Sequence, residues 1–232
     1  MEEELIKIDP HVHSSGISLC SQVTIEQIID EKRKLGYDGM IVANHCQAHY
    51  CRPEEHREFM ERVIKEYQRG KAYGDELGFK VWLGLEVSVQ HPGYSDWLLY
   101  GVTEEFLLAA PCLYNLTQKE LFELCEEGNV LLVQAHPFRQ APRDVRYMHG
   151  VEINCTGGDL EKWEEVIAFA KQNALAVTCG TDYHNVARTF RGGMFVPKVL
   201  NSAVEFANYL RTVKKTSLFL EEKTLEIPAE NL

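Results

Sequence analysis

The sequence predicts an α/β domain in which a mainly parallel β-sheet closes into a barrel. Apolar segments of strand length alternate with helical segments along the chain, and this alternation is typical of parallel sheets. Histidines and acidic residues lie at the ends of the apolar segments. Because a barrel gathers its strand ends at one pole, whereas an open sheet spreads them out, closure is the better prediction.

Chain length and composition agree with one domain. With 232 residues and 45% hydrophobic side chains, the chain can bury a sizeable core, so we expect one domain over residues 1–232. The formal net charge is −11 and no basic stripe occurs, which argues against a nucleic-acid partner. Composition does not predict the oligomeric state.

The cysteines and the N-terminus favour a reducing compartment. Seven cysteines are an odd number and include no Cys-x-x-Cys pair, so a disulfide framework is not expected. No signal peptide follows Met1, and no apolar run approaches the length of a membrane span. We therefore expect a cytoplasmic protein without a membrane partner.

Capping and turn residues place the elements in order. Strands are expected at residues 5–8, 39–45, 80–89, 97–102, 130–135, 151–155 and 176–179, with a short terminal strand at 217–220. Helices are expected at 24–35, 53–77, 117–127, 159–172 and 201–212. Residues that commonly begin helices open four of these segments, and a glycine follows three of them (Thr24, Pro53, Thr117 and Asp159; Gly36, Gly78 and Gly128).

Two histidines follow the first strand. The segment at residues 5–8 leads into Asp9-Pro10-His11-Val12-His13, and side chains two residues apart in a strand point to the same face. His11 and His13 therefore form a metal-binding pair, because neutral imidazole is a common ligand of Zn, Mn and Fe. Asp9 is expected on the same face, as a ligand or as a partner that orients an imidazole.

The same spacing returns near the other end of the chain. Asp182 and His184 are again two residues apart after an apolar run, and His45 and His136 lie at the ends of other strands. Glu86 lies inside an apolar strand, where a carboxylate is costly to bury without a partner. A cation beside Glu86 is the economical explanation.

Six short motifs occur in the order found in the polymerase and histidinol phosphatase (PHP) superfamily, which the sequence resembles over residues 5–190. They are Asp9-Pro-His-Val-His13, Ala43-Asn-His45, Gly84-Leu-Glu86, Ala135-His-Pro-Phe-Arg139, Gly150-Val-Glu-Ile-Asn154 and Gly180-Thr-Asp-Tyr-His184. The resemblance implies a distorted (β/α)7 barrel, two or three divalent metal ions (Zn, Mn or Fe) and hydrolysis of phosphoric esters.

The resemblance also implies a role for each ligand. The first metal would be held by His11, His13, Glu86 and Asp182; Glu86 would bridge to a second metal, which His136 also binds; and His45 and His184 would serve a third. Glu86, Asp182 and His184 would be the catalytic residues. Asn44 departs from the usual motif, which has Asp. Cys20 is a candidate for the third site, and either His91 or Asp96 for the second. Glu152 and Asn154 share one strand face and are expected to support the ligands.

Binding a phosphate to an acidic protein requires local positive charge. Arg139 follows His136 by three residues and Arg188 follows His184 by four, so both are expected at the same pole. A guanidinium can bind phosphate bidentately, and a surface salt bridge is the alternative role. Arg143 and Arg191 are weaker candidates. A second group, Cys46, His49, Cys51 and His56, matches no standard zinc-finger spacing and is interpreted as structural or solvated.

We therefore predict a metal-dependent phosphoesterase, and specifically a phosphomonoesterase that hydrolyses a small phosphorylated metabolite with a metal-bridged hydroxide. One alternative is a metal hydrolase of the amidohydrolase type, which also begins with His-x-His. The short chain, Glu86 at a position where lysine would be expected, and the second pair of ligands argue against it. Another alternative is a non-catalytic metal-binding PHP module, against which the near-complete ligand set argues.

Overall fold

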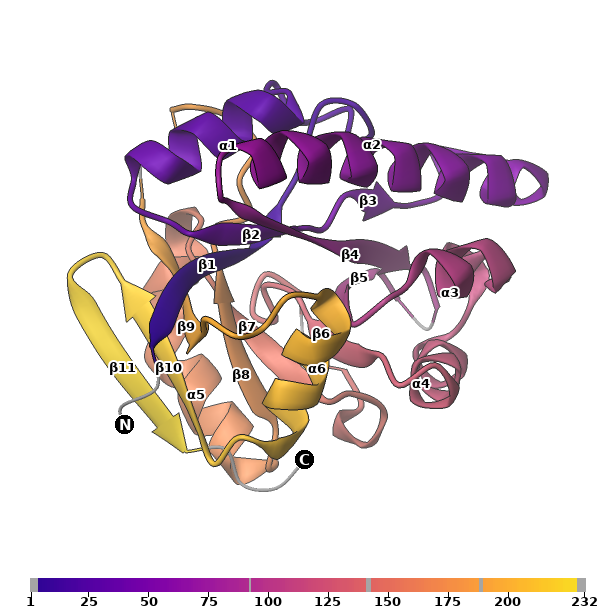
Figure 1. Cartoon of the computed structure of the whole chain (residues 1–232). Helices are drawn as coiled ribbons and strands as arrows, with labels where there is room; N and C mark the ends of the chain where they lie inside the picture. Colours follow the sequence, from indigo (N-terminus) through magenta and orange to yellow (C-terminus); the bar gives the residue numbers. More distant parts are fainter. Residues whose placement is uncertain (1–3, 92, 141–142, 188–189, 229–232) are drawn as a thin grey trace.

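A β-sheet that curves into a barrel forms the centre of the structure, with helices on its outer side (Figure 1). The computed structural model describes residues 4–91, 93–140, 143–187 and 190–228. Its strands are β1 (Leu5–Val12), β2 (Gly39–Val42), β3 (His45–Cys46), β4 (Lys80–Val89), β5 (Ser95–Tyr100), β6 (Leu131–Gln134), β7 (Gly150–Asn154), β8 (Ala176–Gly180), β9 (Gly192–Pro197), β10 (Lys215–Leu220) and β11 (Lys223–Pro228). Its α-helices are α1 (Ile25–Lys34), α2 (His56–Glu76), α3 (Glu104–Ala109), α4 (Gln118–Glu127), α5 (Trp163–Gln172) and α6 (Ala203–Thr212).

The strand order confirms a distorted α/β barrel. Hydrogen-bonded neighbours run β11-β10-β9-β1-β2-β4-β5-β6-β7-β8, with β3 paired to the end of β4. The sheet closes where the chain beyond β8 meets the end of β1: Tyr183 N donates to His11 O (3.3 Å) and His13 N donates to Tyr183 O (3.0 Å). The first half of β1 pairs with β9 instead. The barrel is therefore closed at the pole where the β1 histidines lie and is extended by β9–β11 at the other end.

The prediction of a mainly parallel sheet is wrong for several strands. β5 runs antiparallel to both β4 and β6, and β9, β10 and β11 are also antiparallel to their neighbours. Only residues 90–94 join β4 to β5, and a parallel crossover needs a dozen or more residues. The strand expected at residues 39–45 is divided into β2 and β3, and the strands β9 and β11 were not predicted.

Two of the four predicted helix starts are confirmed, and the other two segments begin as short 3-10 helices. The segment expected to open at Pro53 starts as the 3-10 helix η1 (Pro53–Glu55), which α2 follows. Thr24 and Thr117 both form capping boxes, with Gln27 and Glu120 as their partners. The segment expected to begin at Asp159 starts instead as the 3-10 helix η4 (Gly157–Lys162), and α5 follows it. Asp159 does not cap α5, because its carboxylate accepts hydrogen bonds from a guanidinium at the barrel pole. The short helix α3 was not predicted.

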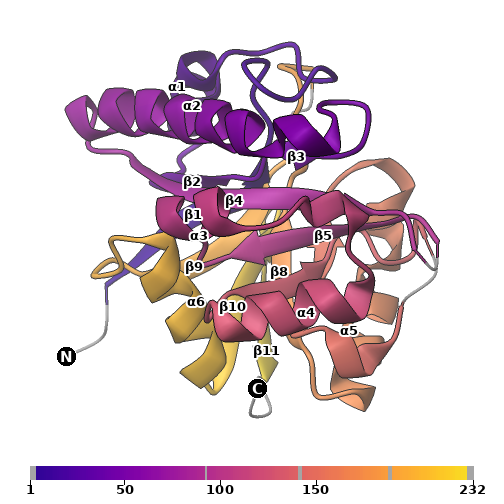
Figure 2. The same cartoon turned by 90° about the vertical axis from the view of Figure 1, so that its right-hand side faces the viewer.

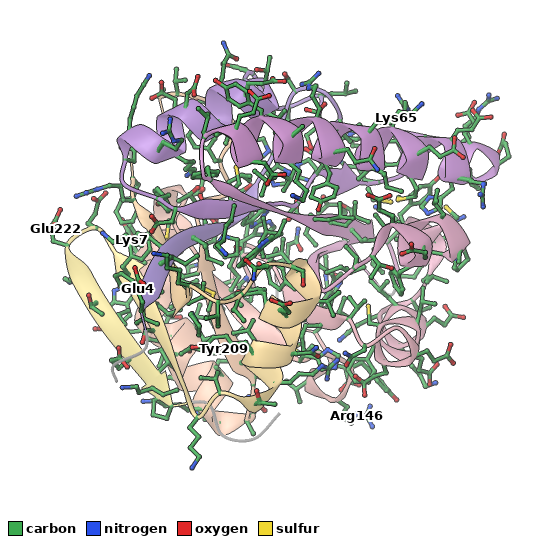
Figure 3. All side chains as sticks on the ribbon, in the orientation of Figure 1. Glu4, Lys7, Lys65, Arg146, Tyr209 and Glu222 are labelled. Carbon is green, nitrogen blue, oxygen red and sulfur yellow. The ribbon has the colours of Figure 1, made fainter. Side chains whose placement is uncertain are left out.

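Helices α1 and α2 lie side by side over β1, β2 and β4 (Figures 1 and 2). Ile25, Ile28 and Ile29 of α1 are fully buried against this part of the sheet, and each contributes roughly 1.5–3 kcal/mol of burial free energy. Figure 3 shows Lys65 pointing away from the barrel on the outer face of α2. Within the described residues, no helix is long and apolar enough to cross a membrane.

Candidate metal centre

All seven predicted ligands meet at the carboxyl ends of the barrel strands. The end of β1 supplies His11 and His13, β3 supplies His45, β4 supplies Glu86, the segment after β6 supplies His136, and the segment after β8 supplies Asp182 and His184. Six of the seven are buried, and His45 is half-buried. The parallel strands β1, β2 and β4 explain this convergence, because their carboxyl ends share one edge.

Glu86 lies at the centre of the group. Its Oε1 is 3.3 Å from His136 Nε2 and 3.6 Å from His11 Nε2. Its Oε2 is 2.6 Å from His45 Nδ1 and 3.5 Å from His13 Nε2. Both oxygens are fully buried, and within the described structure neither accepts a hydrogen bond of good geometry. The two oxygens thus face two different pairs of imidazoles, as a carboxylate that bridges two cations must.

Asp182 completes a first group of ligand atoms with the β1 histidines. Its Oδ1 lies 3.3 Å from His13 Nε2 and 3.7 Å from His11 Nε2. The two Nε2 atoms of His11 and His13 are 2.8 Å apart. These three ligand atoms lie within 4.8 Å of one another, which is close enough for one metal ion to contact all of them.

A second group of candidate ligand atoms includes Asp96 and does not include His91. Ligand atoms of Glu86, Asp96 and His136 lie within 4.8 Å of one another, and His136 Nε2 is 3.8 Å from Asp96 Oδ2. His91 is exposed and belongs to none of the ligand groups in the described residues. Asp96 faces the site because β5 turns back against β4, which places Asp96 opposite Ser88. Ser88 Oγ donates to Asp96 Oδ1 at 2.6 Å.

A third group joins His13, His45 and His184. The Nε2 atoms of His45 and His184 are 3.4 Å apart. Cys20 lies beside this group: burial raises the pKa of its thiol, but interactions with His184 and His45 outweigh burial and lower the pKa to about 5. The Cys20 Sγ is also 3.5 Å from the hydroxyl of Tyr50. Cys20 is thus near the third group without being one of its converging ligands.

Outer contacts orient the ligand imidazoles. Glu152 Oε1 lies 2.7 Å from His11 Nδ1, which leaves His11 Nε2 to face the site. Its Oε2 accepts hydrogen bonds from His136 N (3.2 Å) and Asn154 Nδ2 (2.9 Å). His184 Nδ1 lies 2.8 Å from the carbonyl oxygen of Asp182, so its Nε2 also faces inward. The supporting role predicted for Glu152 and Asn154 is therefore confirmed.

Asn44, which departs from the usual motif, holds the loop after His13. Its Oδ1 accepts hydrogen bonds from Ser14 N and Ser18 Oγ, each at 2.8 Å. Ser18 Oγ in turn lies 3.4 Å from His13 Nδ1. Asn44 therefore holds the loop that contacts His13, and its own side chain belongs to none of the ligand groups in the described residues.

Two of the predicted ligands have a strained backbone. His136 has φ 31° and Asp182 has φ 50°, in the left-handed region that residues with a Cβ rarely adopt. Such conformations cost about 1–3 kcal/mol each and persist only where the surrounding structure holds them. The positions of the His136 and Asp182 side chains are therefore maintained at a cost in local backbone free energy.

The expectation for Asp9 is wrong. The pairing of β1 with β2 changes register between Asp9 and Val12, around Pro10, which has no N–H to donate. This irregularity turns Asp9 away from the face of His11 and His13. The Asp9 carboxylate lies 2.5 Å from Lys32 Nζ and touches no imidazole in the described structure.

Arg139 reaches the metal centre, but it is already paired. Its Nη2 lies 2.6 Å from Asp159 Oδ2 and 3.3 Å from Asp182 Oδ2, and the side chain is 40% exposed. Arg188, the other predicted phosphate ligand, falls outside the described residues. The weaker candidates turn elsewhere: Arg143 donates to the carbonyl of Tyr94 and Arg191 pairs with Glu221 and Glu222.

Charges at the site compensate one another. Burial lowers the pKa of His11, His45 and His136, but Glu86 and, at His11, Glu152 outweigh burial and raise these pKa values above the usual one, so a metal ion bound there would displace protons. Burial alone would raise the pKa of Glu86, but His45 and His11 outweigh it and hold the pKa well below its usual range, so the carboxylate is ionised. Burial and His45 hold the pKa of His13 well below its usual value, so this imidazole keeps a free lone pair. A buried charged carboxylate without hydrogen bonds, surrounded by imidazole nitrogens, is a donor set that fits Zn, Mn or Fe.

The second cysteine and histidine group does not form a comparable site. Cys46, Cys51 and His56 are buried and His49 is exposed, and among the described residues they form no converging ligand group. This agrees with their interpretation as structural or solvated residues.

Comparisons with solved structures show that the chain has a known fold. The structure matches a two-domain protein from Bacteroides vulgatus that contains a predicted PHP-like metal-dependent phosphoesterase (TM-score 0.65, 19% identity, 96% of this chain and 66% of that one). It also matches an amidohydrolase from Chromobacterium violaceum, solved with sulfate and without metal (TM-score 0.60, 12% identity, 88% of this chain and 96% of that one). A third match is the lesion-specific endonuclease PfuEndoQ from Pyrococcus furiosus (TM-score 0.59, 17% identity, 90% of this chain and 56% of that one). No known family and no curated protein matches the sequence.

The fold and the ligand groups define the class of protein as an α/β barrel with a candidate multi-metal centre. Within that class, the chain has the barrel fold of the PHP-like metal-dependent phosphoesterases. The chain spans less than two thirds of the Bacteroides and Pyrococcus proteins.

Proposed function

We propose that the protein is a metal-dependent phosphoesterase, and specifically a phosphomonoesterase of a small phosphorylated metabolite. The position of Glu86 carries this proposal: a buried, ionised carboxylate has one oxygen toward His11 and His136 and the other toward His13 and His45. A pair of cations placed there would activate water and stabilise the charge that develops on a phosphoryl group.

The chain's own residues would contribute orientation and charge. Glu152 fixes the ring of His11, and Asp182 and His184 share the edge of the site from which Arg139 projects. The exposed part of the Arg139 guanidinium is available to a phosphate at this edge. Turnover of phosphorylated metabolites in the presence of Mn, Zn or Fe tests the proposal; no turnover of any phosphate ester by the metal-loaded protein would refute it.

A small substrate is favoured over a nucleic acid. The net charge of −11 repels a polyanion, whereas one phosphate needs only local positive charge. The fold alone does not decide this, because PfuEndoQ shares it. Hydrolysis of a DNA or RNA strand faster than that of monoesters would point to a nuclease, and hydrolysis of amides alone would point to the amidohydrolase alternative. Metal binding without any turnover would favour the non-catalytic module.

Replacement of Arg139 by Ala should raise KM for phosphate esters by about tenfold or more, because a charge-assisted hydrogen bond contributes about 1.5–3 kcal/mol. Steady-state kinetics and metal content measure the effect. Arg146→Ala is a matched control: Arg146 also pairs with an aspartate, Asp144, but it projects from the surface (Figure 3), and Asp144 belongs to no ligand group in the described residues. An unchanged KM in Arg139→Ala would leave Arg139 as a salt-bridge residue.

Replacement of Cys20 by Ser should weaken the binding of one metal, most clearly zinc, if the Cys20 thiolate completes the third ligand group. Competition with a chromogenic chelator measures each zinc affinity. Cys112→Ser is the control, because Cys112 is half-buried and belongs to no ligand group in the described residues. Native zinc occupancy and activity in Cys20→Ser would show that Cys20 is not a metal ligand.

A further inference from the structure

Lys32 is a buried cation on the inner face of α1. Its side chain is 1% exposed, and its Nζ lies 2.5 Å from Asp9 Oδ2 and 3.0 Å from Thr181 Oγ1. The ring centroids of Tyr37 and Tyr183 lie 4.8 and 4.5 Å from the same Nζ. A desolvated ammonium is held in this way only when nearly every direction offers it an acceptor or an aromatic face.

Asp9 and Thr181 link Lys32 to the two chain segments that supply the first group of ligand atoms, the end of β1 and the segment after β8. Asp9 Oδ1 accepts hydrogen bonds from His11 N (3.2 Å) and from Thr181 N (3.0 Å), and Asp9 Oδ2 accepts one from Thr181 Oγ1. His11 opens the first ligand pair, and Thr181 immediately precedes Asp182. One carboxylate therefore joins the backbone of the two segments that supply the first group of ligands.

Both of these segments are irregular. β1 changes register between Asp9 and Val12, and Asp182 has φ 50°. Irregular and strained backbone needs surrounding contacts to persist. Asp9, Lys32 and Thr181, which we call the β1–β8 clamp, provide these contacts from the outer side of the barrel wall, opposite the ligands.

We propose that Lys32 is a positioning residue of the metal centre. Through the β1–β8 clamp it fixes the spacing between the His11/His13 pair and the Asp182/His184 pair. Its contribution is separate from the neutralisation of a buried Asp9 charge, because Lys32 also binds Thr181 directly. The role concerns metal binding, so it does not depend on which ester the protein hydrolyses.

The test uses Co²⁺ as the probe. Lys32→Met should lower the affinity for Co²⁺ by about tenfold or more, as the loss of outer contacts does at other metal sites, and should change the visible absorption of the bound Co²⁺. Arg211→Met is the matched control: Arg211 of α6 is a mostly buried cation that pairs with Glu126 of α4, and Glu126 belongs to no ligand group in the described residues. It should leave Co²⁺ affinity and absorption unchanged.

A double variant separates positioning from stability. Asp9→Asn/Lys32→Met contains no uncompensated buried charge, so it should regain most of the Tm that Lys32→Met loses while its Co²⁺ affinity and absorption stay altered. Thr181→Val removes only one hydroxyl from the clamp, so it can be measured even if Lys32→Met does not fold. This variant should shift the Co²⁺ absorption in the same direction as Lys32→Met does. Native Co²⁺ affinity and absorption in the double variant, or in Thr181→Val, would overturn the proposal.

Discussion

Replacement of Glu86 by Gln should lower the turnover of phosphate monoesters by about a thousandfold or more, even in excess metal. Two bound cations supply several kcal/mol of transition-state stabilisation, and about 1.4 kcal/mol corresponds to a factor of ten. Gln keeps the shape of the side chain but removes the charge that faces His11 and His136 on one oxygen and His13 and His45 on the other. Two metal sites should therefore weaken together.

His136→Ala provides the contrast, because His136 contacts only one oxygen of Glu86 and should empty mainly one site. Glu126→Gln is the matched control: Glu126 Oε1 also faces a histidine, His149, at 2.7 Å, but outside the ligand groups. Elemental analysis and steady-state kinetics of the three variants measure the result. Near-normal turnover and full metal content in Glu86→Gln would show that Glu86 does not bridge.

Removal of the metals with a chelator should abolish turnover and lower Tm by about 5–10 °C for each site that was saturated at 100 times its Kd. Saturation to that degree stabilises the folded state by about 2.7 kcal/mol, and 1 kcal/mol shifts Tm by about 2–4 °C in a protein of this size. Without metal, the ionised Glu86 keeps only imidazole neighbours that do not align as hydrogen-bond donors in the described structure.

Thermal unfolding of the chelated and the reconstituted protein measures this effect, and Mn, Zn and Fe are added back one at a time. Glu86→Gln serves as the control, since it should lose little Tm on chelation if it binds little metal. An unchanged Tm and an unchanged rate after complete metal removal would contradict a metal-dependent function.

The local pattern of the sequence predicted those parts of the fold that short segments determine. Thr24 and Thr117 form capping boxes because the partner three residues later is present in the same segment. The antiparallel direction of β5 was also predictable, because the seven residues between the strands expected at 80–89 and 97–102 cannot hold a crossover helix. β9 was missed because it begins with two glycines and ends in proline, which are weak strand formers.

The candidate ligands were predictable, because histidine and carboxylate side chains are costly to bury without a partner. The residues that surround these candidate ligands were harder to predict. Asp9 leaves the ligand face because of a register shift that alternation alone cannot show. Asp96 enters the site only because β5 folds back on β4. Lys32 lies in a helix rich in charged residues and resembles a surface residue until Asp9 and Thr181 are placed beside it. These features depend on pairing between distant segments.

The metal content of the purified and reconstituted protein tests the central claim most directly. Three groups of ligand atoms, two of which share His13 and one of which includes Glu86, converge within the described structure. Elemental analysis should therefore find at least two transition-metal ions per chain. Fewer than one ion per chain after reconstitution with Mn, Zn and Fe would contradict the account.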